Sequence, residues 1–186
     1  NHGTARNGGS TTDARVCRGG WFRGEGYSLT QAPWWVQARH YVEVPRHTSL
    51  SPLDMSTSSA ITISAWIRPD SLTGTHTVIH KGEGGATQEY RVHLENGRLH
   101  FTVWDRWGAP YTLQLGHALT PGQWYFFAAT AKRRGASGNV TFELTLYGSA
   151  SDTPIAGASS GNISFDLTSK NTSARLFIGG TSWGGT

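Results

Sequence analysis

The sequence predicts an all-β fold, a two-sheet antiparallel β-sandwich of the jelly-roll kind. Apolar and polar residues alternate with a period of two in one segment after another, as in strands that bury one face. Turn-forming residues separate these segments, 24 of the 186 residues being glycine, and no segment has the spacing of an amphipathic helix. The apolar fraction of 37% suits sheets that turn half of their side chains to water. At this length we expect one domain, residues 1–186.

Ten segments carry the alternation strongly enough to be predicted as strands, and so many strands in one domain imply two packed sheets. In chain order they are residues 14–22, 40–44, 60–68, 76–81, 89–95, 98–104, 110–115, 123–132, 140–148 and 174–179. Two long connections lie between them, at residues 47–59 and 148–162. The second is made of small and polar residues, so we expect a surface excursion there and not a strand.

The pair Asn96 and Gly97 sets the register of one predicted hairpin. This dipeptide favours a two-residue turn in which both residues have positive φ. His93 then lies opposite His100. The apolar side chains of both strands fall on one side, which is the predicted core face. Its members are Tyr90, Val92, Leu94, Leu99, Phe101 and Val103.

The next hairpin needs a loop of odd length to keep its apolar residues on the same core face. The simplest loop is residues 106–108, with Gly108 in the left-handed conformation that glycine tolerates. Thr102 then lies opposite Thr112. We expect the other face of these strands to be open to water. It carries Glu89, Arg91, His93, His100, Thr102, Trp104, Thr112 and Gln114.

The tip of this second hairpin is the best candidate for a binding site. Trp104 and Trp107 flank Asp105 and Arg106 there, and a flat indole beside hydrogen-bonding groups suits stacking against a pyranose ring. The alternative is that these tryptophans brace the sheet beneath a loop. Together with three side chains of the outward face, the predicted ligand-binding residues are Trp104, Asp105, Arg106, Trp107, Arg91, His93 and His100.

Several segments resemble the laminin-G-like, concanavalin A-like family of jelly-roll domains. The matching segments, in the order that the family has them, are HYVEVP at 40–45, ITISAW at 61–66, GQWYFFAAT at 122–130, FELTLYGSA at 142–150 and LFIGG at 176–180. The resemblance covers nearly the whole chain and implies the same two-sheet fold. Trp66 and Trp124 belong to these motifs, so we interpret them as packing residues.

The resemblance also implies a function: a non-catalytic recognition or adhesion module of an extracellular or cell-surface protein, which binds carbohydrate or another cell-surface ligand. Many relatives bind calcium, so the resemblance alone implies calcium binding. The sequence itself shows no evident cofactor, and we assign no residue as a metal ligand on the basis of the resemblance. The opening with VCRG at 16–19 is similar to modules of bacterial surface and type IV pilus proteins. Relatives usually carry further strand motifs at both ends, so we expect this domain to lack its outermost strands and to leave sheet edges open.

Charge and cysteine content limit the partners. The net charge is +4, but Lys and Arg are scattered apart from the run at 132–134, so we expect no nucleic-acid binding. No apolar segment approaches the roughly 20 residues that span a bilayer, so we expect no membrane insertion by this segment. Cys17 is the only cysteine in the sequence and cannot form an internal disulfide. A neighbouring chain could meet this thiol or the open sheet edges.

Two alternative functions stay open. A polysaccharide lyase acting on acidic glycans needs a cation to neutralise a uronate and a group that moves a proton, and these could come from Arg91, His93, His100 and Gln114. Hydrolysis by paired carboxylates has no such support, because no two acidic residues have the spacing of a catalytic pair. Glu95, for example, lies opposite Arg98 and not opposite another acid. The other alternative is a structural domain of a pilus-like surface fibre.

Two histidine pairs raise the question of a transition metal. His93 and His100 face each other across the first hairpin, but two ligands alone make a poor site. His76 and His80 lie four residues apart on one predicted strand and should share a face, two pleats from each other. The sequence therefore leaves metal binding open.

Overall fold

In the structure, a computed structural model, the described residues are 4–7, 15–18, 25–28, 40–44, 60–83, 87–134, 139–164 and 174–180. Over these ranges the chain consists of strands and their connections. None of the described residues forms a helix long and apolar enough to cross a membrane. The predicted connection at 47–59 lies outside the described residues, as does the side chain of Cys17.

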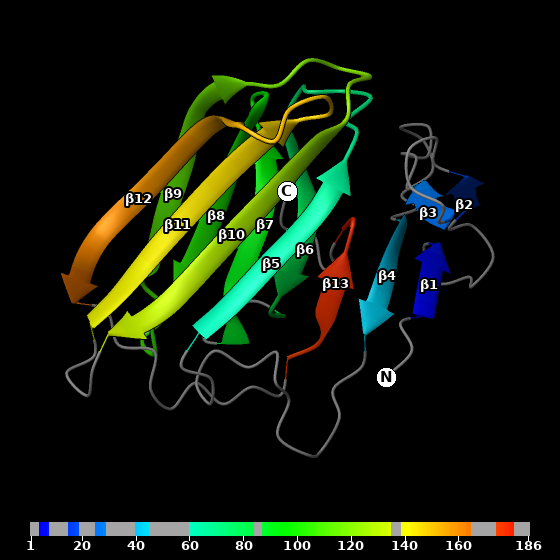
Figure 1. The fold of residues 1–186 in the computed structure, drawn as a ribbon. Helices are drawn as coiled ribbons and strands as arrows, with labels where there is room; N and C mark the ends of the chain where they lie inside the picture. Colours follow the sequence, from blue (N-terminus) through cyan, green and yellow to red (C-terminus); the bar gives the residue numbers. More distant parts are fainter. Residues whose placement is uncertain are drawn as a thin grey trace.

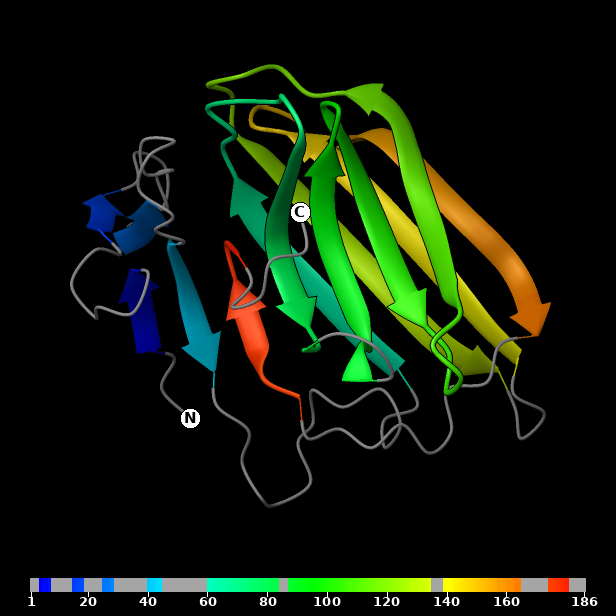
Figure 2. The ribbon, with the colours of Figure 1, turned by 180° about the vertical axis from the view of Figure 1, so that it is seen from behind.

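The strands form two antiparallel sheets that lie face to face, which confirms the predicted sandwich (Figure 1). The large sheet has seven strands, in the spatial order β1 (Thr4–Asn7), β4 (His40–Val44), β13 (Leu176–Ile178), β6 (Thr75–Lys81), β7 (Tyr90–Glu95), β8 (Arg98–Trp104) and β9 (Pro110–Ala118). The small sheet has four, in the order β12 (Pro154–Ser164), β11 (Asn139–Gly148), β10 (Tyr125–Arg134) and β5 (Ala60–Ile67). A separate hairpin pairs β2 (Arg15–Arg18) with β3 (Glu25–Ser28). Figure 2 shows the large sheet in front of the small one.

The hydrophobic core lies between the sheets, where alternate side chains of facing strands meet. The predicted core-face residues of β7 and β8 are each no more than 4% exposed, which confirms the alternation. From the small sheet, Phe127, Phe142 and Leu144 are no more than 1% exposed. The Phe142 ring lies 6.3 Å from that of Phe101 and 5.3 Å from that of Tyr111, centroid to centroid, so one side chain links β11 to both β8 and β9. Each such burial stabilises the fold by about 1.5–3 kcal/mol.

The hairpin between β7 and β8 has the predicted register. Asn96 and Gly97 both have positive φ, 49° and 76°, so the turn is of the expected type. His93 pairs with His100, as that turn requires. Local turn chemistry therefore decides which side chains meet across this hairpin.

Strand β12 occupies a segment for which the sequence predicted a surface excursion, so that prediction is wrong. The strand pairs with β11 along the edge of the small sheet. Ala156 and Ala158 are half-buried and pack against the core, whereas Ser159, the next residue along the strand, is exposed. The alternation is present, but alanine, glycine and serine differ too little in polarity for a period of two to be visible in the sequence.

The N-terminal region also differs from the prediction. Instead of one strand over 14–22, β2 and β3 form a short hairpin. Strand β1 pairs with β4 and covers one edge of it. Its four residues, TARN, are too few and too polar to show an alternation, so the sequence offered no signal for this strand.

An irregularity in β6 changes the face on which one histidine lies. The register of β6 against β7 shifts within the strand, as at a β-bulge. His76 therefore lies opposite Leu94 of the core face, and His80 lies opposite Arg91 of the outer face. The prediction that His76 and His80 share a face is wrong, because one extra residue reverses the alternation. The Nε2 atom of His76 lies 2.9 Å from the carbonyl oxygen of Thr73.

Candidate functional site

The hairpin between β8 and β9 ends in a tip, residues 105–109, that Asp105 holds together. The Asp105 carboxylate accepts hydrogen bonds from the backbone amides of Trp107 and Ala109, at 2.9 and 2.7 Å. Its own amide donates to the carbonyl of Ala109 at 2.9 Å, and its carbonyl accepts from Gly108 at 3.0 Å. Gly108 has the predicted left-handed conformation, with φ of 88°. These bonds give the tip a defined backbone on which side chains are displayed.

Trp107 projects from this tip into solvent. It is 68% exposed, more than any other large hydrophobic side chain among the described residues. The guanidinium carbon of Arg106 lies over the ring, 4.4 Å from its centroid, which is the geometry of a cation–π contact. The tip thus presents a flat apolar surface beside a hydrogen-bond donor, the combination that the sequence predicted.

Trp104, which the sequence placed in the open beside Trp107, is buried. It is only 8% exposed. The guanidinium carbon of Arg91 lies 5.9 Å from the centroid of its ring, and the ring of His80 lies 6.2 Å away. The expected exposure of Trp104 is wrong because side chains from β6 and β7 pack beside it. A role for Trp104 in ligand binding stays a prediction.

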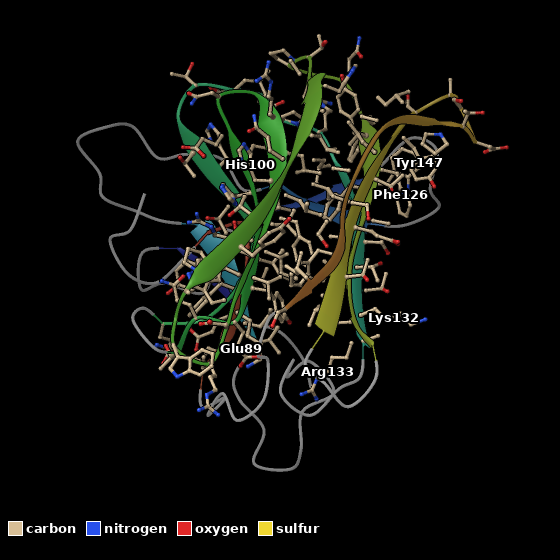
Figure 3. The ribbon with its side chains drawn as sticks, turned by 90° about the vertical axis from the view of Figure 1, so that its left-hand side faces the viewer. Glu89, His100, Phe126, Lys132, Arg133 and Tyr147 are labelled. Carbon is tan, nitrogen blue, oxygen red and sulfur yellow. The ribbon has the colours of Figure 1, made fainter. Side chains whose placement is uncertain are left out.

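Other side chains of the outward face are buried as well, so the prediction of a hydrated surface is wrong for most of it. The exposed fractions of Glu89, His93, His100 and Thr102 are 1%, 3%, 8% and 3%. Figure 3 shows His100 on the side of the large sheet that faces away from the small sheet. These side chains cover one another: the rings of His93 and His100 stack 5.0 Å apart, centroid to centroid, and Glu89 forms an ion pair with Lys81. Thr112, on the edge strand β9, is exposed as predicted.

Burial keeps the imidazoles of this face neutral at about pH 7. It lowers the pKa of His93 to about 3, and the charges of Arg91, His100 and His80 add to this effect. Burial likewise lowers the pKa of His80 to about 4, with Arg91 adding to the shift and a hydrogen bond with Gln88 opposing it. The pKa values of His100 and Arg91 are lowered too, mainly by burial.

One group of side chains within the described residues could ligate a metal. His93, Glu95 and His100 each offer a ligand atom, and these atoms lie within 4.8 Å of one another. The sequence identified the two histidines but treated Glu95 as a surface charge opposite Arg98, because the position of a diagonal neighbour depends on side-chain conformation. Calcium prefers oxygen ligands, so a set with two imidazoles does not suit it, and we assign none of the described residues to calcium.

A second aromatic surface escaped the sequence reasoning. Trp66, Phe126 and Tyr147 lie side by side across β5, β10 and β11, with ring centroids 5.5 and 5.8 Å apart. Figure 3 shows Phe126 and Tyr147 on the side of the small sheet that faces away from the large sheet. Trp66 packs, as we interpreted, but in this outer row and not in the core. The same interpretation is wrong for Trp124, which is 42% exposed. The sequence did contain a signal: each of three neighbouring strands has an aromatic residue at a position that faces away from the core.

Replacement of Asp105 by alanine should lower the free energy of unfolding by about 1–3 kcal/mol, because two backbone amides of the tip lose their acceptor. Urea unfolding followed by tryptophan fluorescence measures the change. Asp152→Ala is the control, since Asp152 is exposed and a surface substitution costs less than about 0.5 kcal/mol. If the two variants are equally stable, the carboxylate does not hold the tip.

Comparisons with known proteins agree with this fold. A sequence model of the concanavalin A-like lectin/glucanases superfamily matches residues 37–186. No curated protein sequence matches the chain. Among solved structures, the binding domain of botulinum neurotoxin DC in complex with rat synaptotagmin II is similar, with a TM-score of 0.59 and 14% identity over 96% of this chain and 39% of that one. The botulinum neurotoxin serotype D binding domain has a TM-score of 0.56 and 13% identity over 96% and 38%. This chain thus spans about two fifths of those structures, and at such identities the likeness concerns the fold.

Proposed function

This chain belongs to the concanavalin A-like lectin/glucanases superfamily, as its strand motifs indicated, and we propose that it is a non-catalytic recognition module that binds carbohydrate. The observation that carries the proposal is Trp107, 68% exposed at the end of a hydrogen-bonded hairpin tip. A large apolar ring held in water has an unfavourable hydration energy that a stacked ligand relieves.

The tip suits a sugar in shape and in chemistry. The C–H face of a pyranose can stack on the indole of Trp107, and the guanidinium of Arg106 beside it can donate hydrogen bonds to the hydroxyl groups. Because Asp105 fixes the backbone, little conformational entropy is lost when the ligand binds. The similar botulinum neurotoxin structures are binding domains, one of them in complex with synaptotagmin II, which supports a binding role without naming this chain's ligand.

We further propose that the module acts outside the cell, in adhesion or surface recognition, because carbohydrate ligands of this kind are displayed on cell surfaces. Contact with a neighbouring chain, through open sheet edges or Cys17, stays a prediction. So does the pilus-like assembly that such contacts would form. Size-exclusion chromatography with light scattering, with and without a reducing agent, measures whether the chain associates through the thiol.

Trp107→Ala should weaken carbohydrate binding about 30-fold, because truncation of a central aromatic contact costs about 2 kcal/mol. A glycan array with acidic and neutral polysaccharides identifies the ligand, and titration calorimetry then compares the variants. Trp124→Ala is the matched control, since Trp124 is 42% exposed and comes after β9 has run from the tip to the opposite end of the sheet. Calcium and a chelator in parallel titrations test the calcium expectation.

Equal affinity of the Trp107 and Trp124 variants contradicts the proposed site. Loss of binding in Tyr147→Ala, with Trp107→Ala unaffected, would instead place the ligand on the aromatic row of the small sheet. Absence of any ligand on the array contradicts carbohydrate as the ligand class.

The lyase alternative has less support. His93 is only 3% exposed and Arg91 is partly buried, so a polymer chain has no direct access to the groups that would move the proton. Incubation with uronate polymers and detection of an unsaturated, ultraviolet-absorbing product would reinstate it.

A further inference from the structure

Three potential metal ligands converge on the outer face of the large sheet, near the turn at Asn96 and Gly97. His93 and Glu95 are two residues apart on β7 and therefore share a face, and His100 pairs with His93 from β8. One ligand atom from each lies within 4.8 Å of the other two. The Nε2 atom of His93 is 3.8 Å from the Oε2 atom of Glu95. That distance is too long for a hydrogen bond but leaves room for an ion between the two atoms.

The hydrogen bonding of His93 is incomplete in a way that a metal would explain. The side chain is 3% exposed, and its Nδ1 atom is buried without a hydrogen-bond partner. Buried polar atoms nearly always have a partner, and either nitrogen of a neutral imidazole can ligate a metal ion. An ion bound through Nδ1 of His93 would supply the missing interaction.

We propose that His93, Glu95 and His100 bind a zinc ion. Two imidazoles and one carboxylate are a set that zinc accepts, with the fourth tetrahedral position left to water. Copper(II) and nickel(II) would bind the same donors, whereas calcium would not. The Glu95 side chain is 48% exposed while His93 is buried, so the ion would lie at the boundary where water can fill the open position.

The surrounding charges permit a cation. Arg91 lies on the same face two residues before His93, but its guanidinium is directed toward Trp104, at the far end of β8 from His100. The carboxylate of Glu95 offsets part of this positive charge. Among the described residues, Arg98 on β8 and His80 on β6 are further basic groups near the site, and burial keeps His80 neutral near pH 7. The site is separate from the tryptophan tip, which is at the other end of β8.

Titration calorimetry of the untagged protein with zinc chloride tests the proposal. We expect one zinc ion for each chain, and a melting temperature raised by about 5 to 10 °C at a zinc concentration near 100 times Kd. A chelator should reverse the rise, and cobalt(II) should give the visible absorption of a tetrahedral complex. Glu95→Gln and His93→Gln should each weaken binding more than tenfold, about 1.4 kcal/mol.

His117→Gln is the control, because His117 is exposed on β9 and outside the group. Glu95→Gln keeps the side-chain shape at an exposed position, so it decides the matter even if the buried His93 variant does not fold. The proposal is overturned if the unaltered protein binds no zinc, or if Glu95→Gln binds zinc as tightly as His117→Gln does. Trp107→Ala should retain zinc binding, so failure of this site and failure of the carbohydrate site are distinguishable.

Discussion

Acidification from about pH 6.5 to about pH 4 should lower the free energy of unfolding by about 5 kcal/mol through two buried histidines. In the folded chain burial lowers the pKa of His80 to about 4 and that of His93 to about 3, whereas both should lie near 6.5 in the unfolded chain. As the pH falls below about 6.5, the unfolded chain takes up protons that the folded chain does not. The contribution of the two histidines to the free energy of unfolding is therefore fully present above about pH 6.5. Below that pH, the free energy of unfolding falls by about 1 kcal/mol per pH unit for each histidine, until the histidines of the folded chain are protonated as well.

Urea unfolding at several pH values, in the presence of a chelator, measures this slope. His93→Gln should reduce the slope by about half, because one of the two groups no longer titrates. His117→Gln, at an exposed position of β9, is the control for replacing a histidine with glutamine. A slope that is the same with and without His93 would show that carboxylates elsewhere dominate the acid response.

Glu89→Gln should cost about 3–5 kcal/mol of stability, because it leaves a buried ammonium without its counterion. Nζ of Lys81 lies 3.1 Å from Oε1 of Glu89, and the two side chains are 3% and 1% exposed. The same ammonium donates a hydrogen bond to the carbonyl of Ala174 at 3.0 Å. The substitution keeps the shape of the side chain, so the loss reports charge and not volume.

A double-mutant cycle separates the pair from its surroundings. Lys81→Met combined with Glu89→Gln removes both charges and should recover much of the stability that the single variant loses. Glu143→Gln is the control for loss of one exposed acid. If Glu89→Gln is no less stable than this control, the ion pair contributes nothing to the fold.

The candidate site shows how far local sequence reasoning reaches. The register of His93 against His100 was predictable, because a two-residue turn determines which residues face each other. The sequence also placed Trp107 in the tip, beside a left-handed Gly108, but left open whether Trp107 is exposed or braces the sheet. The burial of Trp104 was not predictable, because the side chains that cover it come from β6 and β7, and β6 is outside the hairpin. The proximity of Glu95 to His93 likewise depends on side-chain conformation within the folded sheet.

The sequence by itself determined the all-β class, the core face of β7 and β8 and the shape of both hairpins, because alternation and turn chemistry act over a few residues. Only the tertiary structure decided that β12 is a strand, that β6 carries a bulge and that most side chains on the polar face of the large sheet are buried. The physical reason is that burial and edge pairing depend on neighbours that are distant along the chain. Small residues such as those of β12 become a strand only when β11 offers its hydrogen bonds.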